Sequence, residues 1–242
     1  MLFVLTGDVQ TGKTRWLHDL VEEIASRGVL CEGVLAPGVW RKRTAREMAE
    51  LSAGASAGAS TAAGLGSASP YEKLGIENRL LPDGPTIVFG RRRDLAGEGG
   101  FPARSQSGRA QLGWAISDEA IRCVNDHFDR LSARGDVVVS PDEKHRLPFD
   151  DEGRKRAFSS PAAFLVVDEL GILELVRGGG LTSALHALEA GPTERHPHAL
   201  AVVRSRLVED AREKLEPVWG PLSAIGPDDG GRAAVLSALG LL

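Results

Sequence analysis

The chain has few of the features that mark a secreted or membrane-bound protein. It contains only two cysteines, Cys31 and Cys123, too few for a disulfide framework and without the spacing of a metal site. No apolar stretch approaches the roughly 18 residues that a membrane-spanning helix requires. The first apolar run begins at Leu2, which leaves no room for a signal peptide. We therefore expect a cytoplasmic protein with no membrane partner.

The chain also lacks a large excess of either charge. With 29 basic and 33 acidic residues its net charge is −4, so no global attraction to nucleic acid is expected. The basic runs 41–43 and 91–93 are interpreted as solvated loops. A hydrophobic share of 42% and a charged share of 26% are typical of a globular protein. The length of 242 residues is compatible with one large domain over 1–242.

The most informative segment lies between Gly7 and Thr14, where the pattern G-x-x-x-x-G-K-[ST] is met at every fixed position. An apolar run suited to a strand precedes it, and apolar residues at helical spacing follow it over 13–26. Such a loop turns backbone N–H groups inward, and the helix adds its positive end. Lys13 would reach the β- and γ-phosphates, and the Thr14 hydroxyl would bind Mg²⁺. The predicted nucleotide-binding residues are Gly7, Asp8, Val9, Gln10, Thr11, Gly12, Lys13, Thr14 and Arg15.

A second group of candidate residues follows the apolar run 164–167, which is typical of a central parallel strand. The run ends in Asp168 and Glu169. We expect Asp168 to hold Mg²⁺, largely through water, and Glu169 to orient and deprotonate an attacking water. Arg204 ends the following apolar run, where it either stabilises charge at the γ-phosphate or pairs with a nearby acid. The predicted catalytic residues are thus Glu169, Lys13 and Arg204, and the predicted metal ligands are Thr14 and Asp168.

Strands and helices alternate in the last third of the chain, which predicts an α/β fold with a mainly parallel sheet and helices on both faces. The predicted helices there cover 181–190, 207–215 and 233–239, and the predicted strands cover 200–203 and 222–225. Ligands in such sheets lie at the carboxyl ends of the strands. Gly7, Asp168 and Arg204 all fall at such ends.

Residues 31–116 are interpreted as inserted antiparallel hairpins between the two motifs. The runs 79–81 and 86–89 flank a Pro-Asp-Gly-Pro turn, which favours a hairpin. Residues 51–69 are almost all Ala, Gly, Ser and Thr, and we interpret them as a flexible loop. A helix is predicted over 118–133, and 136–160 is interpreted as an irregular excursion.

The string Val-Asp-Glu-Leu-Gly-Ile-Leu-Glu-Leu over 167–175 resembles the D-E-[IL]-G-x-[ML]-E-L signature of the P-loop nucleoside-triphosphatase family. This family includes the thermophilic and human cancer-related nucleoside-triphosphatases. The resemblance implies a RecA-like core, Mg²⁺, and slow hydrolysis of several nucleoside triphosphates. The resemblance implies that Lys13 and Thr14 bind phosphate and Mg²⁺ and that Asp168 binds the metal. It implies that Glu169 acts on the attacking water. The chain departs from the family at Gln10-Thr11, where an extra glycine is usual.

Two other functions are compatible with the same residues. A nucleotide or small-molecule kinase would use the same loop and metal, with Glu169 as base for an acceptor hydroxyl. A regulatory module would use hydrolysis only to reset a nucleotide-dependent contact. A hydrolase should release phosphate with water alone, whereas a kinase protects its donor until an acceptor binds.

Overall fold

A computed structural model of the chain describes residues 1–7, 11–55, 69–95, 105–106, 114–135 and 162–242. The strands are β1 Leu2–Leu5, β2 Leu30–Leu35, β3 Gly38–Lys42, β4 Tyr71–Leu81, β5 Thr86–Arg92, β6 Trp114–Ile116, β7 Ala163–Leu170, β8 His198–Val203 and β9 Ser223–Ile225. The α-helices are α1 Lys13–Ser26, α2 Ala45–Ala55, α4 Asp118–Gly135, α5 Ile172–Leu175, α6 Thr182–Glu189, α7 Val208–Trp219 and α8 Asp229–Ala238.

All these strands belong to one sheet, in the order β6-β5-β4-β2-β7-β8-β1-β9, with β3 paired to β4. The pairings among β2, β7, β8, β1 and β9 are parallel. Those that join β2, β3, β4, β5 and β6 are antiparallel. The mixed α/β architecture is confirmed, but the prediction of a mainly parallel sheet was wrong. Hairpins need no crossover helix, so they extend the sheet with antiparallel strands beyond β2.

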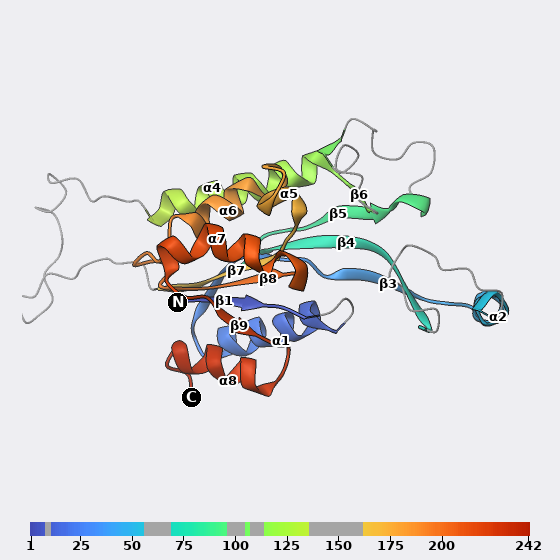
Figure 1. Ribbon diagram of the computed structural model, residues 1–242, viewed down its shortest axis with the longest axis horizontal. Coiled ribbons are helices and arrows are strands. Elements are labelled where there is room, and N and C mark those ends of the chain that lie inside the picture. Colours follow the sequence, from blue (N-terminus) through green and yellow to red (C-terminus); the bar gives the residue numbers. More distant parts are fainter. Residues whose placement is uncertain (8–10, 56–68, 96–104, 107–113, 136–161) are drawn as a thin grey trace, which may run out of the picture.

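Helices cover both faces of the parallel part of the sheet. Helices α4, α6 and α7 lie over one face and α1 and α8 over the other (Figure 1). Each layer has its own buried apolar cluster, because alternate side chains of a strand point to opposite faces. Phe128 and Leu215 belong to the first cluster, and Leu17 and Leu236 to the second.

The first helix follows the predicted boundaries. Its buried residues Leu17, Leu20 and Ile24 lie on one face, as the apolar spacing requires. Gly28 follows the cap residue with a φ of 86°, a left-handed conformation that glycine adopts without strain. The chain then enters β2, which is parallel to the other core strands.

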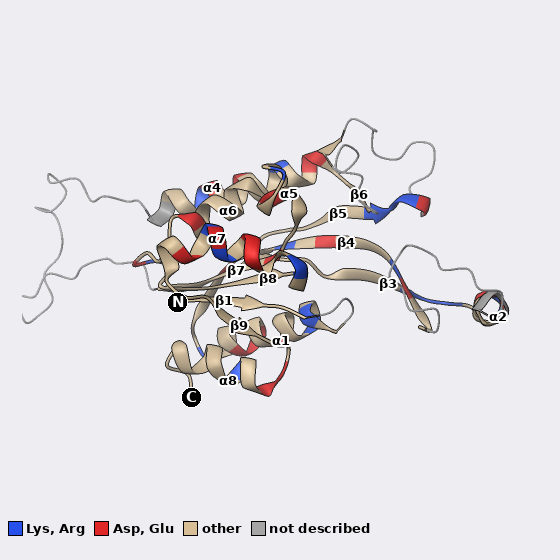
Figure 2. Ribbon diagram, in the orientation of Figure 1, with Lys and Arg blue, Asp and Glu red and all other residues tan. Residues whose placement is uncertain are grey.

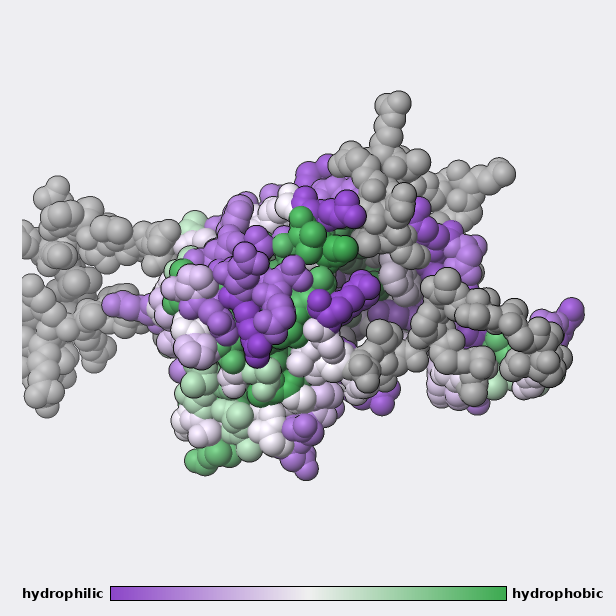
Figure 3. All heavy atoms as spheres, viewed as in Figure 1, coloured by the Kyte–Doolittle hydropathy of each residue, from purple (hydrophilic) through white to green (hydrophobic). Residues whose placement is uncertain are grey.

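The antiparallel strands extend away from the helical body. We call residues 38–55 and 71–75 the arm; it consists of β3, α2 and the first half of β4 (Figure 1). Charged residues gather along β3 and at the end of β5, whereas β1 is uncharged (Figure 2). On the face shown in Figure 3, hydrophilic residues cover α7, and a hydrophobic patch lies beside α5, near which Val176 is 53% exposed.

Most predicted elements of the described residues are confirmed within a few residues. The hairpin over 79–89 is present and longer than predicted, because β4 begins at Tyr71. The interpretation of 51–69 as a loop was wrong at its start, since α2 continues to Ala55. Residues 56–68 and the predicted excursion over 136–160 lie outside the described residues. In the described part of the chain, no helix has both the length and the apolar character needed to cross a membrane.

Candidate functional site

The loop between β1 and α1 has the backbone geometry that its glycines predict. Gly7 has a φ of 145° and Gly12 a φ of 82°, values that residues other than glycine rarely adopt. The Lys13 Nζ donates a 2.8 Å hydrogen bond to the carbonyl oxygen of Gly7, so the ammonium is folded back over the loop. Asp8, Val9 and Gln10 lie outside the described residues, and the adjacent Thr11 and Arg15 are exposed.

The N-terminus of α1 is suited to an anion. Gly12 is the N-cap and has no side chain to bond the first N–H groups of the helix. No acidic residue lies in the first turn, and Lys13 and Arg15 place positive charge there (Figure 2). Backbone N–H groups, the helix dipole and two cations therefore favour a bound phosphate at this point.

Asp168 links this helix to the neighbouring strands. Its side chain is 2% exposed, and its Oδ2 accepts a 2.8 Å hydrogen bond from the backbone N–H of Ala36. The Thr14 side chain also lies close to it. Burial raises the pKa of Asp168 to about 7, and the Ala36 N–H and the Thr14 side chain only partly oppose that effect. A nearby cation would keep such a carboxylate ionised.

Glu169 faces a different environment because the strand is irregular at this point. Val167 pairs with Ala201 and Leu170 with Val203, so β7 has one more residue here than β8. Glu169 has a φ of 74°, the only positive φ of a non-glycine residue in the described part of the chain. A bulge redirects side chains, and backbone strain of this kind clusters at functional sites. The Glu169 side chain is 35% exposed, whereas its neighbour Asp168 is buried.

Arg204 lies beside Glu169, and the structure thus brings together two of the predicted catalytic residues. The Arg204 Nε donates a 2.6 Å hydrogen bond to Glu169 Oε1. The backbone explains the contact, since Arg204 follows the last residue of β8 and Glu169 lies in the adjacent strand. Of the two predicted roles of Arg204, the pairing with an acid is therefore seen directly.

The sequence analysis missed a further cation, Lys73 of the arm. Its charge interacts with Glu169, Asp168 and Arg204, which all act on its pKa. The Lys73 Nζ lies 5.3 Å from the ring centre of Trp114. No motif marks this lysine, because it reaches the site only through the pairing of β3 with β4.

Glu174 of the resemblance string supports the loops around the acid pair. It is 7% exposed, and its carboxylate accepts hydrogen bonds of 2.8 Å from the Gly171 N–H and 2.9 Å from the Leu181 N–H. These bonds hold the start of α5 to the start of α6. Glu174 thus positions the chain that follows Glu169.

The donor set fits magnesium better than a transition metal. Among the described residues, no group of three or more His, Cys, Asp or Glu side chains is arranged to hold a metal ion. The Thr14 hydroxyl and the Asp168 carboxylate are oxygen donors that lie close together. Magnesium accepts few protein ligands because it retains water and binds substrate phosphates.

No protein-family model and no curated protein matches the chain. Among solved structures, the fold is similar to that of a human cancer-related nucleoside triphosphatase, with 14% sequence identity and a TM-score of 0.49. The similarity covers 98% of this chain and 94% of the other.

Proposed function

We propose that the protein is a Mg²⁺-dependent nucleoside triphosphatase of the P-loop type, which hydrolyses a nucleoside triphosphate to the diphosphate and phosphate. The observation that carries this proposal is the buried Asp168 near the end of β7, whose side chain lies close to Thr14 in the first turn of α1. A carboxylate and the N-terminus of a helix thus meet at the carboxyl edge of the sheet, where ligands of such sheets bind.

The site residues divide the work of phosphoryl transfer between binding and water activation. The loop from Gly7 to Arg15 holds the phosphates, with Lys13 placed against the β- and γ-phosphates. Thr14 and Asp168 would hold Mg²⁺, which neutralises charge on the phosphates when it is bound. Glu169 accepts the proton of the attacking water.

The ion pair between Glu169 and Arg204 fits this division of work. Both side chains are partly exposed, at 35% and 45%, so the pair can separate at little cost. Arg204 is then available to stabilise charge on the departing phosphate, while Glu169 faces the water. The resemblance of residues 167–175 to the nucleoside-triphosphatase signature supports the same assignment.

Phosphate release from the purified protein tests this function. We expect release with Mg²⁺, a nucleoside triphosphate and water alone, and no release by Lys13→Ala. The second assay adds nucleoside monophosphates and other candidate acceptors. Consumption that rises about a hundredfold with one acceptor, with labelled phosphate moving onto it, would identify a kinase instead. A panel of triphosphates in the same assay determines the base preference.

A further inference from the structure

The arm supplies a lysine to the site from the side opposite the phosphate loop. Strand β7 lies between β2, which carries β4 and the arm, and β8, which leads to β1 and the loop. Lys13 follows β1 and Lys73 belongs to β4, so the two lysines come from strands on opposite sides of β7. A triphosphate that leaves the loop toward the two acids would have its terminal phosphate between these lysines.

The arm holds Lys73 in a defined place. Lys73 pairs with Trp40 across the strands, and its Cε lies so close to Gly38 that a Cβ there would be only 2.7 Å away. Its ammonium lies over the Trp114 ring, which attracts a cation. Gly38 and Trp114 thus confine the aliphatic stem and the charged head of this side chain.

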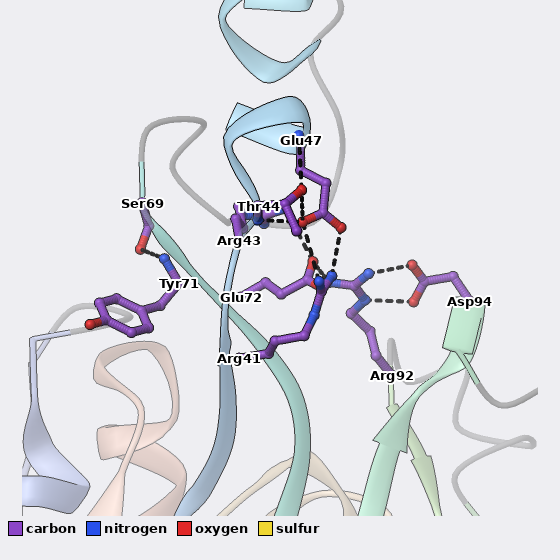
Figure 4. Close-up of polar contacts among 9 residues, drawn as sticks. All are labelled: Arg41, Arg43, Thr44, Glu47, Ser69, Tyr71, Glu72, Arg92 and Asp94. Carbon is purple, nitrogen blue, oxygen red and sulfur yellow. Dashed lines mark hydrogen bonds and ion pairs between the residues drawn. The ribbon is translucent and has the colours of Figure 1, made fainter. Parts of the chain in front are cut away.

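Neighbouring charges on the arm explain why Lys73 is directed to the site. Glu72 is 5% exposed and binds the guanidinium groups of Arg41, Arg43 and Arg92, as Figure 4 shows. Arg92 is held in turn by Asp94, with hydrogen bonds of 2.6 and 2.7 Å. Successive side chains of a strand point to opposite faces, so Lys73 points away from this cluster.

Lys73 has no ion pair with a carboxylate of the described residues, unlike the arginines around Glu72. Burial lowers its pKa, whereas the nearby Glu169 and Asp168 raise it. An ammonium confined in this way, without a close anionic partner in the part of the chain that the structure describes, is suited to receive one.

We propose that Lys73 binds the terminal phosphate of the nucleotide and makes the site selective for triphosphates over diphosphates. This inference rests on the proposed function and adds a specificity-determining residue to it. A diphosphate would be held by the loop and Lys13 alone, because it lacks the phosphate that reaches Lys73.

Calorimetry with Mg²⁺ and either a non-hydrolysable triphosphate analogue or the diphosphate tests the proposal. For Lys73→Met, which keeps the apolar stem, we expect triphosphate affinity to fall about tenfold to a hundredfold, the range of a charge-assisted hydrogen bond. Diphosphate affinity should stay within about twofold, well below that range. Lys73→Arg should restore part of the loss. Lys214→Met, at an exposed lysine of α7, is the matched control and should change neither affinity.

The outcomes separate this inference from the proposed function. An equal loss for both nucleotides, or no loss for either, would overturn the role of Lys73 while the parent still binds and hydrolyses triphosphate. A parent protein that binds no triphosphate would overturn both proposals. If Lys73→Met is unfolded by circular dichroism, Lys73→Gln and Lys73→Arg provide the same comparison of the two affinities.

Discussion

Two buried carboxylates at opposite ends of adjacent strands have opposite electrostatic environments. Glu32, near the start of β2, is 2% exposed and forms hydrogen bonds with Arg195 at 2.6 Å and His196 at 2.8 Å. Burial alone would raise the pKa of Glu32, but these partners lower it to about 2. Asp168, near the end of β7, is equally buried, and its pKa is instead raised to about 7.

The difference separates a structural acid from one suited to a ligand. Glu32 has the positive Arg195 and a hydrogen bond with His196 within the fold, so its charge stabilises the native state. Asp168 has an N–H group and a hydroxyl as partners but no ion pair with a cation of the described residues. Burial of a carboxylate without a paired cation is costly, and such groups mark functional sites. Removal of the charge should therefore change the stability of the protein differently at the two ends of the sheet.

The largest expected effect is on catalysis at the carboxyl end. Glu169→Gln keeps the shape of the side chain but cannot accept a proton from water, so we expect hydrolysis to fall about 10²–10⁴-fold. Single-turnover hydrolysis with Mg²⁺ measures this change, and triphosphate binding should be retained. Glu213→Gln, at an exposed position of α7, is the control. A rate within about threefold of the parent, far below that general-base range, would show that Glu169 is not the base.

The second largest effect is expected on stability, at Glu32 near the start of β2. Glu32→Gln removes the buried carboxylate that pairs with Arg195, and we expect the free energy of unfolding to fall by about 3 kcal/mol at pH 7. For a chain of this size that corresponds to a decrease of about 8 °C in Tm. Because the folded pKa of Glu32 is lowered to about 2, its stabilisation is complete above its unfolded pKa, which is about 4.3.

The same stabilisation is lost as the pH falls from about 4.3 toward 2. The difference in the free energy of unfolding between the parent and Glu32→Gln should therefore become smaller over this range. Urea unfolding at several pH values measures it. A constant difference in the free energy of unfolding across this range would mean that packing rather than charge stabilises the region around Glu32.

A smaller effect of opposite sign is expected for Asp168→Asn. Because the folded pKa of Asp168 is raised to about 7, its charge opposes folding progressively as the pH rises from about 4 to 7. Asparagine carries no such charge, so the nucleotide-free variant should be as stable as the parent at pH 8, or more stable by a few degrees in Tm. A loss as large as that of Glu32→Gln would erase the distinction between the two acids.

The smallest effect is expected for the segment of low sequence complexity. Deletion of 57–67 removes small side chains and a single leucine, too little apolar surface to add much to a core. We expect hydrolysis and stability to remain at the level of the parent. A fall in Tm above about 5 °C, or roughly 1–2 kcal/mol, would show that this segment packs against the protein.

Local patterns in the sequence were enough to predict the parallel part of the molecule. The run 164–167, the helix over 13–26 and the glycines that bound the phosphate loop are short-range signals. They reflect burial on both faces, helical periodicity and left-handed backbone angles, and each acts within a few residues. The prediction that Asp168 would lie near Thr14 followed from the rule that parallel strands end at one edge.

The tertiary structure alone decided how charges meet across the sheet. The sequence marks Glu32 and Asp168 only as acids in or beside apolar runs. Burial raises the pKa of Asp168, whereas His196 and Arg195, which are distant in the chain, lower the pKa of Glu32. Lys73 likewise reaches the acid pair through strand pairing in the arm. Electrostatic interactions depend on distance in space and on burial, and neither is encoded by local periodicity. The sequence by itself therefore determined the glycine-bounded loop and the acid pair, and the fold decided which charges surround them.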